Sequence, residues 1–151
     1  MESGTQDIIP HKLVILIDDN SIDNFVNQSI IEKYKFSEKV IAFTKAGVAL
    51  EYISDLDEKQ DTEAEVPSFI FLDLNMPLIN GFQFLEIFDK LSPFIKSKTK
   101  IVILTSSANP NDIIQTGIHK NVLTFLQKPL LKSNLDELGI SLKDKSKISI
   151  K

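Results

Sequence analysis

Residues 69–77 read Phe-Ile-Phe-Leu-Asp-Leu-Asn-Met-Pro, and this stretch limits what the chain can fold into more than any other. Four consecutive apolar residues run directly into Asp73, and Pro77 ends the stretch. A continuous apolar run of this kind is typical of a strand buried on both faces, as strands of parallel sheets are. We therefore predict a buried parallel strand with Asp73 at its carboxyl end, which is where open α/β sheets bind ligands.

Four other apolar runs have the same form, and they alternate with segments in which apolar residues recur at helical spacing. The predicted strands cover residues 13–17, 40–43, 69–72, 101–104 and 122–126. The predicted helices cover residues 22–34, 44–53, 82–91, 110–117 and 134–142. This alternation within one domain favours an α/β fold, a five-stranded parallel sheet with helices on both faces.

The sequence also predicts where the helices begin and end and which of their faces are buried. The first helix is expected to bury one apolar face, formed by Ile22, Phe25, Val26, Ile30 and Tyr34. We expect Thr44 to cap the second helix and Pro93 to help end the third. The acidic stretch 54–67 is predicted to be a structureless, solvated connection, because it lacks the spacing of a calcium-binding loop.

Composition excludes several classes of function. The net charge is −4 and all 17 basic residues are lysines, so the chain lacks the arginines that read guanine edges and clamp phosphates, and no nucleic-acid partner is expected. It has no apolar run of the roughly 20 residues that a membrane span needs, so no membrane insertion is expected. The absence of cysteine rules out disulfides and thiolate metal sites and is consistent with a cytoplasmic protein.

Polar residues suited to one kind of chemistry stand at the ends of four predicted strands: Asp18 and Asp19, Asp73, Thr105 and Lys128. In a parallel sheet these ends lie along one edge. Crowded carboxylates repel one another unless a cation joins them, and a ligand set made only of oxygen favours a hard ion such as Mg²⁺. With a lysine ammonium and a threonine hydroxyl available for phosphoryl oxygens, the pattern predicts phosphoryl chemistry with Asp73 as the carboxylate nucleophile.

Each of these features is weak alone, since an Asp-Asp pair is commonly a helix cap and a Lys-Pro pair a surface turn. Two other classes of protein also remain open. An aspartate-nucleophile phosphatase or hydrolase would need a second Asp two residues after the first, where this chain has Asn75. A flavin- or nucleotide-binding protein of the same fold would need a phosphate-binding loop where Asp18 and Asp19 stand.

Taken together, these motifs resemble those of the response-regulator receiver domains of two-component signalling. The matching residues are Ile17 to Asp19, Gly47 to Leu50, Leu72 to Pro77, Gly81, Leu104 to Ser106, and Lys128 with Pro129. The resemblance covers residues 12–143, with a lead-in at 1–11 and a polar tail at 144–151. It implies a flavodoxin-like sheet with strand order 2-1-3-4-5.

The resemblance also implies a role for each site residue. Asp73 would be the phospho-acceptor, and Asp19 would bind Mg²⁺ directly. Asp18 would bind the ion directly or through water, and the backbone carbonyl of Asn75 would complete the protein ligands. Lys128 would bond a phosphoryl oxygen, and the peptide bond that follows it would be cis.

Two further residues would form the switch of such a domain. Thr105 would follow the phosphoryl group, and Phe125 would fill the space that Thr105 leaves. This would change the surface formed by the helix at 110–117, the strand at 122–126 and the last helix. On composition alone Phe125 is a core residue, and an inward rotamer in one of two states satisfies both interpretations.

The resemblance implies partners rather than a substrate. The phosphoryl donor would be a sensor histidine kinase or a His-phosphotransfer protein, and the downstream target would be a protein contacted in trans. The chain would not be an enzyme beyond Mg²⁺-dependent self-phosphorylation and self-dephosphorylation. A receiver that relays phosphate onward, or one that is never phosphorylated, remains an alternative.

Overall fold

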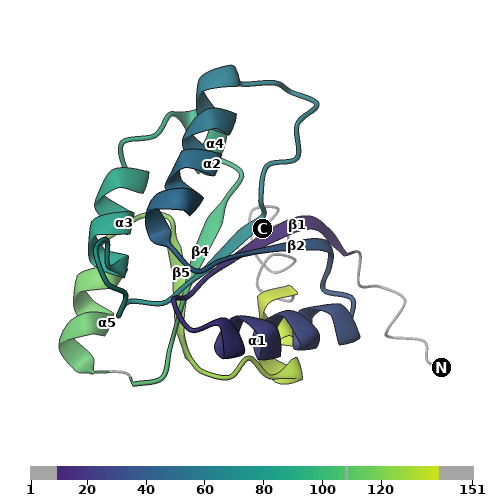
Figure 1. The fold of residues 1–151 in the computed structure, drawn as a ribbon, viewed down its shortest axis with the longest axis vertical. Coiled ribbons are helices and arrows are strands. Elements are labelled where there is room, and N and C mark those ends of the chain that lie inside the picture. Colours follow the sequence, from purple (N-terminus) through teal and green to yellow (C-terminus); the bar gives the residue numbers. More distant parts are fainter. Residues whose placement is uncertain (1–9, 108, 140–151) are drawn as a thin grey trace, which may run out of the picture.

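The computed structural model describes residues 10–107 and 109–139 (Figure 1). Five parallel strands form one sheet in the order β2-β1-β3-β4-β5, which confirms the predicted fold. The strands are β1 (His11–Ile17), β2 (Ser37–Phe43), β3 (Phe69–Leu72), β4 (Lys100–Thr105) and β5 (Val122–Gln127). Every residue of β3 is buried, as expected of a strand covered on both faces.

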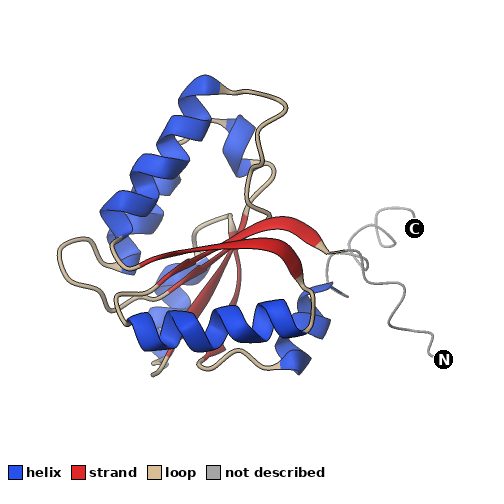
Figure 2. Cartoon of the chain, turned by 45° about the vertical axis from the view of Figure 1, so that its right-hand side comes forward, coloured by secondary structure: helices blue, strands red, loops and turns tan. Residues whose placement is uncertain are grey.

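Six helical segments in the described part of the chain cover the sheet (Figure 2). They are α1 (Ser21–Lys33), α2 (Ala46–Lys59), α3 (Gly81–Phe88), α4 (Pro93–Lys96), α5 (Pro110–Gly117) and a final helix over 132–139. The final helix and α1 pack on one face of the sheet, and α2, α3 and α4 pack on the other.

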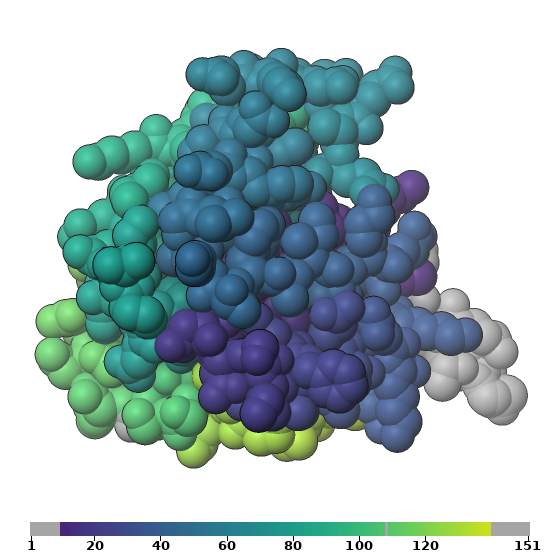
Figure 3. Space-filling view, in the orientation of Figure 1, coloured from purple at the N-terminus to yellow at the C-terminus, as the bar shows by residue number. Residues whose placement is uncertain are grey.

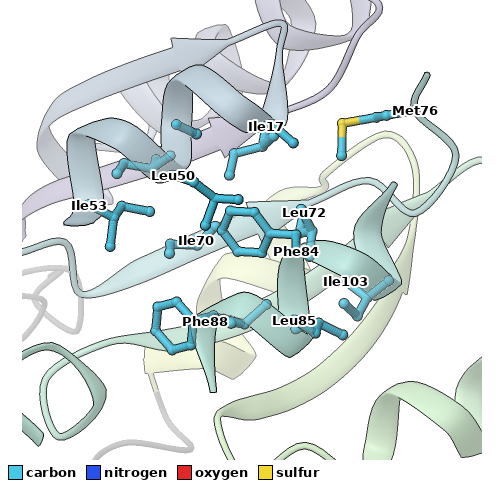
Figure 4. Close-up of a cluster of buried hydrophobic side chains, with 14 of the residues drawn as sticks. Ile17, Leu50, Ile53, Ile70, Leu72, Met76, Phe84, Leu85, Phe88 and Ile103 are labelled. Atoms are coloured by element: carbon cyan, nitrogen blue, oxygen red, sulfur yellow. The ribbon is translucent and has the colours of Figure 1, made fainter. Parts of the chain in front are cut away.

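The alternation of side chains along the strands divides the core into two clusters. On the face covered by α2 and α3, Leu50 and Phe84 meet over the strand residues Ile70 and Leu72 (Figure 4). The opposite cluster joins Val14 and Leu16 of β1 to a smaller set of residues from α1 and the final helix: Ile31, Leu135 and Leu138.

Most of the predicted buried face of α1 is wrong, although Ile30 is half-buried and packs against the core. Ile22 and Phe25 are 71% and 72% exposed, whereas the buried residues of α1 are Asn24, Asn27 and Ile31. Helical spacing cannot distinguish an apolar face that packs inward from one that faces solvent, and here tertiary contacts turn a polar face toward the sheet.

The region around α2 also differs from the predictions. α2 continues to Lys59, so the first part of the stretch expected to be structureless is helical. Asp55 and Glu58 are exposed there, whereas Asp57 is half-buried and accepts from the N–H and the hydroxyl of Ser92. This segment contains good helix formers such as Leu56, which packs against the core. Thr44 does not cap the helix, because Lys45 occupies the cap position and makes no side-chain hydrogen bond there.

The predicted helix at 82–91 is two helices. α3 ends at Phe88, and Pro93 begins α4 rather than ending the preceding helix. Proline suits the first helical position because an N–H group there would have no partner within the helix. Ser92 caps α4, since its hydroxyl oxygen accepts from the N–H of Phe94.

The described residues include only part of the segments predicted at the two ends of the chain. β1 begins at His11, and the final helix is described as far as residue 139. Most of the predicted lead-in, the end of the predicted last helix at 142 and the predicted tail lie outside the described residues. Within those residues, none of the helices is long and apolar enough to span a bilayer.

His11 makes the stability of the fold depend on pH. Its ring lies 4.8 Å from that of Phe36 and 5.1 Å from that of Phe69, and burial lowers the pKa of the imidazole below its ordinary value of 6.5. The unfolded chain therefore binds the proton more readily, so this contribution to stability is present above pH 6.5 and is lost as the pH falls below 6.5 through the lower pKa of the folded state.

We expect His11→Phe to retain the aromatic packing and to gain stability relative to the native chain as the pH falls from 7.5 to 5.5. Urea unfolding of both proteins at a series of pH values measures this. A difference in the free energy of unfolding between the two proteins that does not change over that range would contradict the role given to His11.

Candidate functional site

The strand register places the predicted site residues at one edge of the sheet. Ile17 pairs with Leu72, and Leu72 pairs with Ile103, so Asp18 and Asp73 leave neighbouring strands at the same level. Farther along the edge, the backbone N–H of Lys128 donates to the carbonyl of the β4 residue Thr105 at 2.8 Å. Parallel pairing thus brings these four strand ends together, as the sequence predicts.

Asp18, Asp19 and Asp73 form an acidic cluster. Each can offer a carboxylate oxygen such that the three oxygens lie within 4.8 Å of one another. Asp18 and Asp73 are buried and Asp19 is exposed, so the cluster opens to solvent on one side. An oxygen-only ligand set with an open side suits a hard divalent cation that keeps some of its water.

Lys128 provides the balancing positive charge. Its Nζ lies 2.5 Å from an oxygen of Asp18, 2.9 Å from one of Asp23 and 3.6 Å from one of Asp73. The lysine side chain is only 11% exposed, so its contacts with the buried Asp18 and Asp73 are little screened by water, whereas Asp23 is 36% exposed. The peptide bond between Lys128 and Pro129 is cis, as expected.

Burial and mutual repulsion shift the protonation of these groups. Burial, followed by the charge of Asp18, raises the pKa of Asp73 to about 6, against the opposing effect of Lys128. Burial also raises the pKa of Asp18, although the hydrogen bond from Lys128 opposes it. Burial alone would lower the pKa of Lys128, but the hydrogen bonds to Asp18 and Asp23 outweigh it and raise the value.

The remaining predicted residues surround this cluster. Thr105 is completely buried, and its hydroxyl oxygen has no hydrogen-bond partner among the described residues. Phe125 is half-buried, pairs with Ile103 and packs against the core cluster under α2 and α3. The Asn75 side chain is exposed, two residues after Asp73. An unsatisfied buried hydroxyl is costly, so Thr105 is suited to a partner that arrives from outside the chain.

Gly81 holds the start of α3 against the strand end that carries Asp73. A Cβ at this position would lie 2.7 Å from Leu74 Cα and 2.8 Å from the carbonyl oxygen of Asp73. The Gly81 N–H donates to the Leu74 carbonyl at 3.0 Å, and Asn80 caps the helix in a capping box. Only glycine permits this approach, which explains its place in the sequence motif.

Three residues of α1 contribute to the site but were not predicted. Asp23 binds Lys128, the Asn24 amide donates to the Asp18 carbonyl at 3.0 Å, and Asn27 accepts from the N–H of Leu130 at 3.0 Å. Their only signal in the sequence is a polar set at helical spacing, which is also what an ordinary solvated face looks like.

The geometry can be compared with known proteins. The family model described as "Response regulator receiver domain" matches residues 14–138, and the chain belongs to this family. No curated protein matches the chain. Among solved structures it is similar to a two-component response regulator from Cytophaga hutchinsonii, with 29% identity and a TM-score of 0.79. That match covers 90% of this chain and 99% of the other.

Two other solved structures show the same fold. A response regulator receiver protein from Dyadobacter fermentans DSM 18053 has 27% identity and a TM-score of 0.72, over 84% of this chain and 94% of that one. A CheY-like receiver domain protein from Methanospirillum hungatei JF-1 has 19% identity and a TM-score of 0.69, over 91% and 98%. The flavodoxin-like fold is thus confirmed, and the last of these likenesses concerns the fold alone.

The raised pKa of Asp73 predicts a stability effect in protein kept free of divalent cations. The folded state binds the proton of Asp73 more tightly than the unfolded state, so stability is lost as the pH rises from about 4 through about 6. We expect Asp73→Asn to raise the free energy of unfolding by about 2 kcal/mol at pH 7.5 and to have little effect below pH 4.

Denaturant unfolding in the presence of a chelator measures this difference. Asp136→Asn is a suitable control, because Asp136 pairs with Lys132 on the exposed surface. A difference between Asp73→Asn and the native chain that does not change between pH 4 and 7.5 would contradict the titration assigned to Asp73.

Proposed function

We propose that the chain is a phospho-accepting response regulator in which Asp73 receives a phosphoryl group from a phosphohistidine. The observation that carries this proposal is the buried Asp73 carboxylate beside two further aspartates and the Lys128 ammonium, with the unpartnered Thr105 hydroxyl at the neighbouring strand end. The acidic cluster and the orphan hydroxyl together fit a cation and a phosphoryl group.

In the proposed reaction, a carboxylate oxygen of Asp73 forms a bond to phosphorus as the P–N bond of the donor breaks. The electron pair of that bond stays on the histidine nitrogen, and the ring leaves as neutral imidazole when its other nitrogen carries a proton. Lys128 donates to a phosphoryl oxygen and offsets the growing charge. Asp18, Asp19, Asp73 and the Asn75 carbonyl would hold a Mg²⁺ ion, which would supply further positive charge for the phosphoryl oxygens.

We propose that Thr105 and Phe125 convert this event into a change of surface. The buried Thr105 hydroxyl gains a partner by moving toward the phosphoryl group, and the half-buried Phe125 rotates into the space released. α5 lies beside β5, and apolar residues are exposed there: Ile114 of α5 at 67%, and Ile118, directly after the helix, at 75%. A downstream protein that binds in trans would find an apolar contact there.

The donor side of the proposal is supported by α1, which forms the front surface below α2 in Figure 3. Ile22 and Phe25 are exposed on the helix whose first turn also binds Lys128. An exposed apolar surface at the mouth of a reaction site suits docking of a sensor histidine kinase or a His-phosphotransfer protein. We place this exchange in the cytoplasm, in accord with the cysteine-free sequence.

The phosphatase alternative is disfavoured by the same site. Asn75 stands where such an enzyme would need an acid that can exchange protons, and an amide has no such proton. We therefore propose no catalytic turnover beyond gain and loss of the phosphoryl group on Asp73.

The proposal is tested by the intact mass of the protein after incubation with acetyl phosphate, with and without Mg²⁺. We expect a gain of one phosphoryl group that requires Mg²⁺ and is lost in Asp73→Asn. Asp89→Asn serves as a control carboxylate outside the cluster. If the native chain gains no mass under conditions that label another receiver, the phospho-acceptor function is wrong, and an interaction domain independent of phosphorylation becomes the better interpretation.

The docking surface proposed on α1 predicts different effects on phosphoryl transfer from a small donor and from a protein donor. Because acetyl phosphate needs no docking, Phe25→Ser should leave its labelling rate unchanged while slowing transfer from a phosphohistidine protein about tenfold. Ile87→Ser, which truncates an exposed apolar residue of α3, is the matched control. Equal rates for Phe25→Ser and the native chain with the protein donor would exclude this surface.

A further inference from the structure

Lys128 has a partner outside the strand-end motifs: Asp23, in the first turn of α1. The two side chains meet at 2.9 Å although they are 105 positions apart in the chain. The contact therefore ties α1 directly to the end of β5, at the residue that faces the acidic cluster.

The carboxylate of Asp23 is not occupied by helix capping. Asn20 caps α1 by accepting from the N–H groups of Ile22 and Asp23. In a capping box the third helical residue would bond the cap residue's own N–H in return, but here that N–H donates to Asp18 at 2.9 Å. Asp23 is thereby left free to bind Lys128.

The contact between Asp23 and Lys128 bears on how the site can bind a cation. The Lys128 ammonium binds Asp18 at 2.5 Å, and Asp18 is one of the three carboxylates suited to hold a divalent cation. The ammonium and the cation therefore compete for the same carboxylate. Of the three carboxylates that contact the ammonium, Asp23 alone lies outside the cluster of Asp18, Asp19 and Asp73.

We propose that Asp23 is a positioning residue that holds the Lys128 ammonium toward α1 and so raises the affinity of the acidic cluster for a divalent cation. The inference rests on the proposed Mg²⁺ site. It assigns α1 a part in preparing the site, in addition to the docking surface on its exposed side. Asp23 acts through Lys128 and makes no bond to the cation.

The test is calorimetric titration of MgCl₂ into the native chain, Asp23→Asn, Asp23→Glu, Lys128→Met and the Asp23→Asn/Lys128→Met double variant. We expect Asp23→Asn to weaken Mg²⁺ binding about tenfold, and Asp23→Glu to stay within about twofold of the native chain. In the Lys128→Met background, the further effect of Asp23→Asn should be about twofold or less, because the residue then has nothing to position.

Two controls isolate the contact between Asp23 and Lys128. Asp112→Asn removes a carboxylate from the same third position after an asparagine cap, in α5, and should leave Mg²⁺ affinity unchanged. The Lys128 side-chain NMR signals should shift in Asp23→Asn before any Mg²⁺ is added. A folding defect in Asp23→Asn would not by itself make the loss of Mg²⁺ affinity depend on Lys128. Nor would it explain a near-native affinity in Asp23→Glu.

The outcomes separate this inference from the proposed function. An equal loss of affinity in both Lys128 backgrounds would mean that Asp23 acts by its charge alone, and no loss in either would mean that it has no role. Both results would overturn the inference while Mg²⁺-dependent labelling of Asp73 persisted. Failure of the native chain to bind Mg²⁺ would overturn the inference and the proposed metal site together.

Discussion

The contact of one lysine with three aspartates is the interaction on which the rest of this structure depends. Asp18 and Asp73 are almost fully buried, and carboxylates placed so close together repel strongly in surroundings of low polarity. Lys128 offsets part of that repulsion because it approaches both of them and Asp23 as well. The fold must therefore bring the Lys128 ammonium, directly after β5, next to carboxylates that follow β1 and β3 and to one on α1.

The parallel topology of the sheet makes this arrangement of side chains possible. Each crossover helix returns the chain to the same end of the sheet, so every strand releases its polar residues along one edge. Hydrogen bonds then fix individual segments: Asn24 holds the loop after β1, Asn27 holds the segment after the cis peptide, and Gly81 lets α3 begin directly against β3. These contacts fix the segments that carry Asp18, Asp73 and Lys128 relative to one another.

Much of this could be predicted because the strands are short, apolar and followed directly by polar residues. Asp18, Asp19, Asp73 and Lys128 were predicted to converge from that pattern alone, and they do. The resemblance to receiver domains added the strand order and the cis peptide bond, and both are present. Local sequence was sufficient wherever a residue's position along a strand determines where its side chain lies.

The predictions failed where tertiary contacts decide. The apolar spacing of α1 favoured Ile22 and Phe25 as buried residues, but the inward face combines Ile31 with two asparagines that bond backbone groups of other segments. No local pattern shows that Asn27 will meet Leu130, because the two are 103 positions apart. Pro93 was similarly ambiguous, since proline both follows one helix and begins another.

The polar attachment of α1 has a consequence for how the molecule opens. A helix held by a broad apolar stripe can loosen independently of polar groups at its margin. Of the buried residues of α1, two are asparagines, and these bond the segments that carry Asp18 and Lys128. Detachment of the helix would therefore disrupt the acidic cluster at the same time, so that local unfolding of α1 and loss of the cluster's geometry form one cooperative event.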